Sequence, residues 1–262
     1  MRDIHPTALV SPDAELGEDV KILPHTIIEG NVTIGDRCTI GPFAVIRSST
    51  RIGPDTSVHT GAVLGEPPQD LKYKGEPSFL IIGAHNQIRE FVTLHRATGE
   101  DSATVIGDHN LLMAYSHIGH NCRIGNHCLF ANYAGVSGHC TFEDYVTVGG
   151  MVGFHQYVTV GTMAMVAGMS RVLRDVPPYC LVEGDPARPR TINTRGLRRR
   201  GLSEEEINAL HHAFRVLFRS DMNLTQALDK LEAEGPVTAH VRHLIDFMRR
   251  VHQGILGRQY CR

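Results

Sequence analysis

The sequence predicts a mainly β protein, in which a parallel β-helix is followed by a small α-helical domain. Three observations support this prediction. An aliphatic or aromatic residue recurs at every sixth position through most of residues 4–172, a small or β-branched residue follows it four positions later, and a helical pattern replaces both toward the C-terminus. A period of six fits neither an α-helix nor a simple alternating strand, whereas stacked coils of short strands produce it.

The repeat is in phase over residues 4–64, returns at 82–94 and runs unbroken over 106–172. Each repeat predicts a short strand and a corner, so that three repeats close one coil of about 18 residues. We expect the aliphatic and the small residue to point into a prism-shaped core. Glycine often follows the aliphatic residue, as in Ile34-Gly35 and Ile52-Gly53. We expect these glycines to supply the unusual backbone angles of a tight corner.

The stacking of coils predicts which residues become neighbours. Coils stack at about 4.8 Å, so residues 18 apart in an unbroken run should lie directly above one another. In the third run this places Gly138 and then Gln156 above His120, and Gly135 and then Gly153 above His117. The sequence therefore predicts outward-facing imidazoles beside a channel of backbone that carries no side chains.

Two segments interrupt the repeat, at 65–81 and 97–105. Insertions in a solenoid are usually external loops on one face, often a binding face, although a merely solvated loop fits the composition equally well. A Pro-rich and Arg-rich segment follows over 175–200. We therefore expect a β-helix over 1–189, with loops at 65–81 and 97–105, and a helical domain over 190–262.

The helical domain should contain at least three helices. Ser203 and Glu206 form a capping-box pattern that opens the first helix. Apolar spacing predicts a second helix over 224–233 and a third near 237–251.

Composition narrows the function classes. The 262 residues suffice for one solenoid and a small appended domain, and a net charge of -2 gives no basic character that would suggest nucleic acid. Neither a signal peptide nor a run long enough for membrane insertion is present. Of six cysteines, four occupy the small inward position, namely Cys38, Cys122, Cys128 and Cys140. They are expected to be buried thiols in a reducing, cytoplasmic compartment rather than disulfides or metal ligands.

Histidines give the strongest chemical signal. There are sixteen, and His117, His120, His139 and His155 fall close together. A histidine beside a backbone N–H and a groove suits acyl transfer, with a base for a hydroxyl and a donor for the oxyanion. Two alternatives remain: these histidines lie on the surface of a non-catalytic scaffold, or His117, His120 and His139 hold zinc.

Particular motifs resemble one family closely. The chain resembles the acyl-carrier-protein-dependent UDP-N-acetylglucosamine O-acyltransferases of lipid A biosynthesis over nearly its whole length, in the segments 65–73, 95–96, 110–113, 116–120, 149–151, 155–156, 175–179 and 196–201. The resemblance implies a left-handed winding, a homotrimer with sites between subunits and no resident cofactor or metal. It implies transfer of an (R)-3-hydroxyacyl group from acyl carrier protein to the glucosamine 3-position of the sugar nucleotide.

The resemblance also implies residue roles. His120 matches the general base, and Gly138 matches the residue whose N–H binds the thioester oxyanion. Gly150 and Gly168 match the acyl groove, and Gly168 matches the position that limits acyl length. The matching substrate contacts are Gln69, Asp70 and Lys72 on the first loop, His117, His139, His155 and Gln156 on the coils, and Asn193, Arg199 and Arg200 toward the nucleotide and its phosphates.

Asn121 departs from the family pattern, in which aspartate commonly follows the base. Asparagine can accept a hydrogen bond from the ring but adds no charge, so the strength of base activation is open. The acceptor is equally open between UDP-N-acetylglucosamine and its 3-amino analogue, which would give an amide. A zinc lyase like the β-helical carbonic anhydrases is a further alternative. Arginines at 188, 190, 195 and 198–200 could attract acidic acyl carrier protein.

Overall fold

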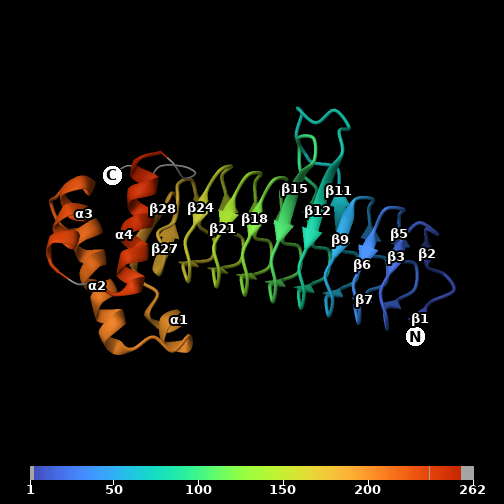
Figure 1. Cartoon of the computed structure of the whole chain (residues 1–262), viewed down its shortest axis with the longest axis horizontal. Coiled ribbons are helices and arrows are strands. Elements are labelled where there is room, and N and C mark those ends of the chain that lie inside the picture. The colour runs from blue at the N-terminus through green and yellow to red at the C-terminus, as the bar shows by residue number, and fades with distance from the viewer. Residues whose placement is uncertain (1–2, 236, 255–262) are drawn as a thin grey trace.

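A computed structural model describes residues 3–235 and 237–254 of the chain. Its body is a long prism of stacked coils, and four helices gather at the end opposite the N-terminus (Figure 1). Residues 236 and 255–262 of the predicted helical domain, and residues 1 and 2 of the predicted β-helix, lie outside the described residues.

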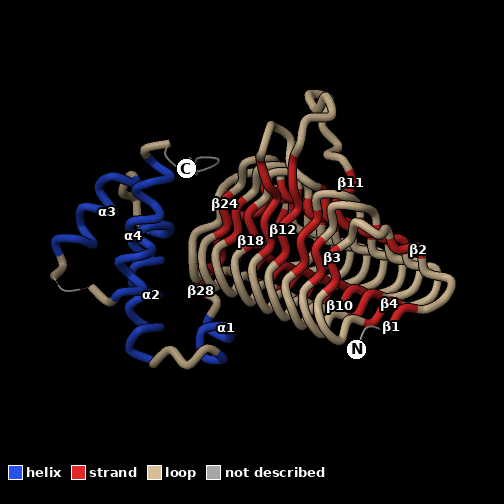
Figure 2. Tube along the Cα trace, turned by 45° about the vertical axis from the view of Figure 1, so that its right-hand side comes forward, coloured by secondary structure: helices blue, strands red, loops and turns tan. Residues whose placement is uncertain are grey.

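Three sheets form the faces of the prism, and every strand except the last pairs in parallel with strands of the neighbouring coils (Figure 2). The first sheet consists of β1 (Asp3–Ile4), β4 (Lys21–Ile22), β7 (Thr39–Ile40), β10 (Ser57–Val58), β13 (Gln87–Ile88), β16 (Leu111–Leu112), β19 (Leu129–Phe130), β22 (Thr147–Val148), β25 (Met165–Val166), β27 (Cys180–Gly184) and β28 (Ala187–Ile192). The second consists of β2 (Leu9–Val10), β5 (Ile27–Ile28), β8 (Val45–Ile46), β11 (Val63–Glu66), β14 (Thr93–His95), β17 (His117–Ile118), β20 (Gly135–Val136), β23 (Gly153–Phe154) and β26 (Arg171–Val172). The third consists of β3 (Glu15–Leu16), β6 (Thr33–Ile34), β9 (Thr50–Ile52), β12 (Ser78–Ile82), β15 (Ser102–Ile106), β18 (Arg123–Ile124), β21 (Thr141–Phe142) and β24 (Thr159–Val160).

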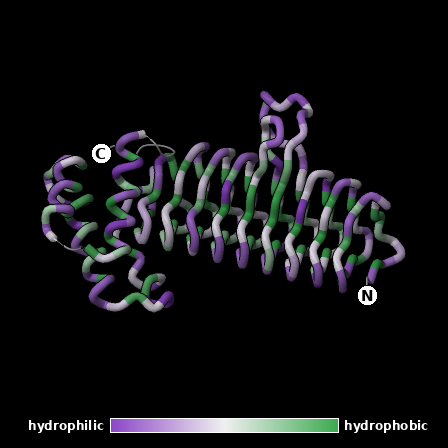
Figure 3. The backbone as a smooth tube through the Cα atoms, in the orientation of Figure 1, coloured by the Kyte–Doolittle hydropathy of each residue, from purple (hydrophilic) through white to green (hydrophobic). Residues whose placement is uncertain are grey.

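The predicted register is confirmed in the third run. His117 pairs with Gly135, and Gly135 pairs with Gly153, so the three residues form one outward column on parallel strands. The aliphatic positions of the hexads line the interior, where Ile40, Ile46 and most of their equivalents are fully buried. Figure 3 shows the apolar residues recurring coil after coil along the prism.

The small inward position holds the predicted thiols. Cys38, Cys122, Cys128 and Cys140 are buried and free of disulfides. Their burial follows from the hexad, because a thiol is small and apolar enough to fill the space between the larger aliphatic residues.

The glycines of the hexads have a different role from the one expected. Gly35 and Gly53 do not adopt left-handed backbone angles. A Cβ at Gly35 would lie 2.6 Å from Pro54 N, and one at Gly53 would lie 2.6 Å from Gly83 C. The expectation of unusual angles is therefore wrong here: these positions need glycine because the next coil passes too close for any side chain. The left-handed corner angles fall instead on other residues, among them Asn31 and Phe43.

Both interruptions form loops that project together from one edge of the prism (Figure 1). Their ends belong to the sheets, since β11 extends to Glu66, β12 begins at Ser78 and β15 begins at Ser102. The projecting parts are thus shorter than 65–81 and 97–105. Strands β12 and β15 pair along five residues each, which holds the two loops side by side.

The coils end in an antiparallel hairpin that the sequence did not predict. Strand β27 continues the first sheet, and β28 pairs with it in the antiparallel sense. Pro189 is tolerated in β28 because that strand lies at the edge of the sheet. Helix α1 (Thr194–Arg199), also unpredicted, follows at once and is capped by the Asn193 side chain.

Three longer helices complete the chain: α2 (Glu204–Arg219), α3 (Leu224–Ala233) and α4 (Ala239–His252). The predicted capping box at Ser203 and Glu206 is present. Leu210, Leu244 and Phe247 are fully buried and belong to the same apolar core as the coils. None of the helices within the described residues is long and apolar enough to cross a membrane.

Candidate active site

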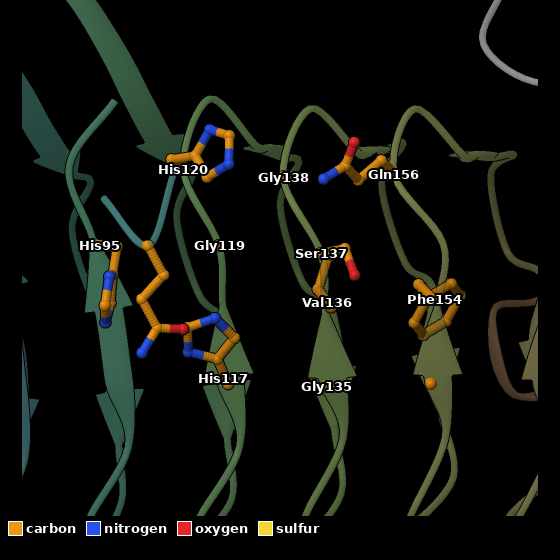
Figure 4. Close-up of a pocket in the computed structure, with 12 residues that line it drawn as sticks. His95, His117, Gly119, His120, Gly135, Val136, Ser137, Gly138, Phe154 and Gln156 are labelled. Carbon is orange, nitrogen blue, oxygen red and sulfur yellow. The ribbon is translucent and has the colours of Figure 1, made fainter. Parts of the chain in front are cut away.

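A groove of about 340 Å³ lies on the outer face of the second sheet, beside the projecting loops. His120, His117, Gly138 and Gln156 line it (Figure 4), and Gln69 from the first loop lines it as well. These are five of the residues that the sequence predicted for the site. The floor is made by β20 and β23, where a Cβ added at Gly135 or at Gly153 would meet no other atom within 4 Å.

His120 is held from one side. Its side chain lies at the corner after β17, and the residue is only 6% exposed. Its Nδ1 atom lies 2.9 Å from Asn121 Oδ1. The opposite edge of the ring faces Gly138, since a Cβ at that glycine would lie 2.5 Å from both Nε2 and Cε1 of His120. Gly138 therefore has to be glycine for the imidazole to occupy its position.

The Gly138 N–H is a backbone donor beside that imidazole. Within the described residues, no group accepts a hydrogen bond from it, whereas the Gly138 carbonyl accepts one from Tyr157 N at 3.2 Å. The neighbouring Ser137 also lines the groove. A base and an unused backbone donor next to one cavity form the arrangement that acyl transfer requires.

Three further histidines surround His120 and are biased toward the neutral form. The pKa of His117 is lowered to about 4, mainly by burial and to a smaller extent by the neighbouring His95 and His120. Its Nδ1 atom lies 2.8 Å from Thr93 Oγ1. Burial also lowers the pKa of His95 and of His139. Rings meet edge to face at 5.1 Å in the pairs His95–His117 and His120–His139.

The first loop brings polar groups over the groove. Asp70 Oδ1 accepts a hydrogen bond from Lys72 N at 3.0 Å, and this bond lowers the pKa of the Asp70 carboxyl. Asp70 directly follows Gln69, which lines the groove. Glu76 ties the loops together by accepting hydrogen bonds from Lys74 N at 2.8 Å and Gly99 N at 2.9 Å.

Asn193, Arg199 and Arg200 lie in a second cavity, of about 240 Å³, between the coils and α1. The Arg200 guanidinium lies 4.3 Å above the ring of Tyr145, which also lines this cavity. The structure of the single chain therefore separates these three predicted residues from the groove of His120.

Gly150 and Gly168 are stacked on each other but do not line the groove around His120. Met169 N donates to Gly150 O at 2.9 Å, and a Cβ at Gly168 would lie 3.2 Å from the same oxygen. His155 is exposed beside Gln156 on the coil above Gly138.

His95 lines the groove but was not among the predicted site residues. It is 5% exposed and lies on β14, one coil before His117. Counting in steps of 18 residues does not place His95 next to His117. The second loop lies between their strands, so paired residues such as Thr93 and His117 are 24 positions apart. Its place in the motif at 95–96 was the only signal in the sequence.

Comparisons with known proteins agree with this site. A family model described as bacterial transferase hexapeptide (six repeats) matches residues 13–48, 34–66 and 103–138. A second, described as domain 2 of UDP N-acetylglucosamine O-acyltransferase, matches residues 175–256.

Relatives match along nearly the whole chain. The acyl-[acyl-carrier-protein]–UDP-N-acetylglucosamine O-acyltransferase of Thermodesulfovibrio yellowstonii is 44% identical over 256 residues, 97% of this chain and 99% of the relative. The enzyme of the same name from Halorhodospira halophila is 46% identical over 257 residues, 98% of this chain and 100% of the relative. The crystal structure of a UDP-N-acetylglucosamine acyltransferase from Bacteroides fragilis has a TM-score of 0.94 at 39% identity, covering 98% of this chain and 99% of that one.

The stacked hexapeptide coils and the histidine-lined groove define an acyltransferase built on a left-handed β-helix. Within that class, the chain belongs to the acyl-[acyl-carrier-protein]–UDP-N-acetylglucosamine O-acyltransferase family, since relatives of that name match it almost end to end. The fold class and the family that the sequence predicted are confirmed.

Proposed function

We propose that this chain transfers an (R)-3-hydroxyacyl group from acyl carrier protein to the glucosamine 3-hydroxyl of UDP-N-acetylglucosamine, the first step of lipid A biosynthesis. The observation that carries the proposal is the contact between the His120 imidazole and Gly138 at the edge of a groove. The relatives' names state the same donor and the same acceptor.

His120 acts as the general base in this proposal. Its Nε2 removes the proton from the acceptor hydroxyl while that oxygen attacks the thioester carbonyl. The Gly138 N–H, which has no acceptor within the described residues, stabilises the oxyanion that forms. The carbon–sulfur bond then breaks, and the His120 imidazolium returns its proton to the departing phosphopantetheine thiolate. The thioester supplies the activated acyl group, so no metal or resident cofactor enters the proposal.

The remaining predicted residues bind substrate in this proposal. Gln69, Asp70 and Lys72 hold the sugar nucleotide from the first loop, of which Gln69 lines the groove. His117, His139, His155 and Gln156 contact substrate around the base. Asn193, Arg199 and Arg200 bind the nucleotide and phosphates, because guanidinium groups match phosphate oxygens in pairs. Gly150 and Gly168 leave room for the acyl chain.

A trimer would reconcile the two separate cavities. In a single chain, Asn193 and the arginines lie apart from His120, whereas a site between subunits can use the α1 cavity of one chain with the groove of the next. The exposed arginines around α1 would attract the acidic acyl carrier protein. We place the enzyme in the cytoplasm, where its buried free thiols are stable.

A transfer assay tests the proposal. Purified protein is incubated with (R)-3-hydroxyacyl carrier proteins of several chain lengths and with either UDP-N-acetylglucosamine or its 3-amino analogue, and product mass is recorded. We expect an acylated UDP-sugar, and its mass identifies both acceptor and acyl length. Failure of every donor–acceptor pair, with a folded and trimeric protein, would overturn the proposal.

Substitution of the base is the second test. We predict that His120→Ala lowers kcat by roughly 10²- to 10⁴-fold, the usual contribution of a general base. His5→Ala, at an exposed histidine of the first coil, is the matched control and should keep the wild-type rate. Equal rates for the two variants would remove His120 as the base.

A further inference from the structure

Asn121 makes four hydrogen bonds that join the candidate base to the second loop. Its Oδ1 accepts from Thr98 N at 2.9 Å and faces His120 Nδ1 at 2.9 Å, while its Nδ2 donates to Thr98 O at 2.9 Å. Its backbone N–H donates to Thr104 Oγ1 at 2.8 Å. The side-chain amide is thus paired with both backbone groups of a single residue.

This pairing fixes which way the amide points. A backbone N–H can only donate and a carbonyl can only accept, so the oxygen of Asn121 has to face Thr98 N and the nitrogen has to face Thr98 O. Reversing the amide would break both bonds. The atom beside the His120 ring is therefore an oxygen, which accepts but cannot donate.

The fixed oxygen determines the tautomer of the imidazole. Because Asn121 Oδ1 only accepts, His120 Nδ1 has to carry the ring proton, and the lone pair of the neutral ring is left on Nε2. Nε2 is one of the two ring atoms closest to the position of a Cβ on Gly138. The orientation of one amide thus directs the basic nitrogen of His120 into the groove.

The backbone angle at this corner does not explain the asparagine. Asn121 has a φ of 59°, in the left-handed region that favours asparagine. The equivalent corners one and two coils later have φ values of 62° and 66° and carry His139 and Tyr157. Since larger side chains are tolerated there, the side-chain bonds of Asn121 are the distinguishing feature.

An aspartate could not make the same set of bonds. A carboxylate has no hydrogen to donate to Thr98 O, so one of its oxygens would face that carbonyl. It would also put a negative charge beside Nδ1, which favours the protonated ring. The other titratable groups around His120 are His95 and His117, which line the same groove, His139, whose ring meets that of His120 edge to face at 5.1 Å, and Asp70, next to Gln69 on the first loop.

We propose that Asn121 is a positioning residue, which fixes His120 in the Nδ1–H tautomer and ties it to the second loop at Thr98 without adding charge. The inference rests on the proposed function for its kinetic consequences, but not for the tautomer itself.

The tautomer is tested directly by ¹⁵N NMR of histidine-labelled protein, with His120→Gln used to assign the signal. We expect wild-type His120 to be protonated on Nδ1 and unprotonated on Nε2 near neutral pH. Protonation on Nε2 instead would overturn the proposal. This measurement needs no substrate, so a failure of the transfer assay leaves it interpretable.

Kinetics of two substitutions give the second test. Asn121→Ala should lower kcat about 10- to 100-fold with a smaller change in KM, because the ring loses its fixed tautomer. Asn121→Asp keeps an acceptor for Nδ1–H, so it should recover much of that rate while moving the acidic limb of kcat/KM about one unit toward higher pH.

The matched control is Asn31→Ala, at a corner asparagine with a φ of 54° that lies far from the groove. It should leave both rate and pH profile unchanged. Wild-type kcat in Asn121→Ala, or an unmoved acidic limb in Asn121→Asp, would contradict the proposal. If Asn121→Ala does not fold, the NMR measurement and the Asn121→Asp profile still decide it.

Discussion

At the scale of single residues, burial keeps three histidines around His120 uncharged. Burial lowers the pKa of His95, His117 and His139 alike, so around neutral pH these rings offer hydrogen bonds without positive charge. They also make the folded state sensitive to acid, since each protonates more readily in the unfolded chain.

The sign of this pH dependence follows from the lowered values. The pKa of His117 is about 4 in the folded protein and 6.5 for an ordinary histidine. Between these values the unfolded chain binds the extra proton, so stability is fully present above about pH 6.5 and is lost as the pH falls toward 4. We predict that His117 alone contributes at most about 3 kcal/mol to this loss.

Urea unfolding of wild-type protein and of His117→Asn between pH 4 and pH 7 measures the effect. The free energy of unfolding should fall less steeply with acid in the variant. Parallel curves for the two proteins would show that His117 is not the group responsible.

The sequence predicts which residues are neighbours in the site only where no insertion interrupts the 18-residue count between them. The contact of His120 with Gly138 followed from counting 18 residues, because no insertion falls between them. His95 could not be placed that way, since the second loop intervenes. The cavity of Asn193 and Arg200 lies where helix α1 packs against a coil, and the six-residue repeat does not predict how a helix packs on the coils.

At the scale of the elements, the hexad predicts strands and corners well, because each repeat is one strand whose inward residues share a core. The role of its glycines was misjudged because a sequence shows the period but not the distance between coils. The hairpin of β27 and β28 was missed, since its Pro-containing segment has neither the hexad nor a helical pattern.

Coil spacing gives a prediction for stability. We expect Gly53→Ala to destabilise the protein by about 1–3 kcal/mol, because its Cβ would lie 2.6 Å from Gly83 C and 2.7 Å from Gly83 O of the next coil. Gly153→Ala is the matched control for stability, since nothing lies within 4 Å of that Cβ. Urea unfolding compares the two. A loss of similar size at both positions would show that contact with the next coil does not explain the cost at Gly53.

At the scale of the whole molecule, one edge of the prism carries a ladder of exposed apolar side chains. Phe91, Tyr115 and Tyr133 stack with ring centroids 5.1 and 5.0 Å apart, and they are 46%, 48% and 53% exposed. Met151 and Met169 continue the column at 60% and 78% exposed. Contiguous apolar surface of this kind marks protein interfaces. The ladder is therefore the surface that we expect the proposed trimer to bury.

Charge placed in the ladder tests that expectation. Tyr133→Glu would bring an uncompensated carboxylate into an apolar interface, so we predict dissociation of the trimer and loss of most transferase activity. Leu9→Glu, at a 66% exposed leucine of the first coil, is the control and should leave both unchanged. Analytical ultracentrifugation gives the oligomeric state, and circular dichroism confirms that each variant is folded. A trimeric Tyr133→Glu protein would place the interface on another edge of the prism. A folded, fully active monomer would instead show that one chain supplies the complete site, and that the groove of His120 and the cavity of Arg200 need not be joined across subunits.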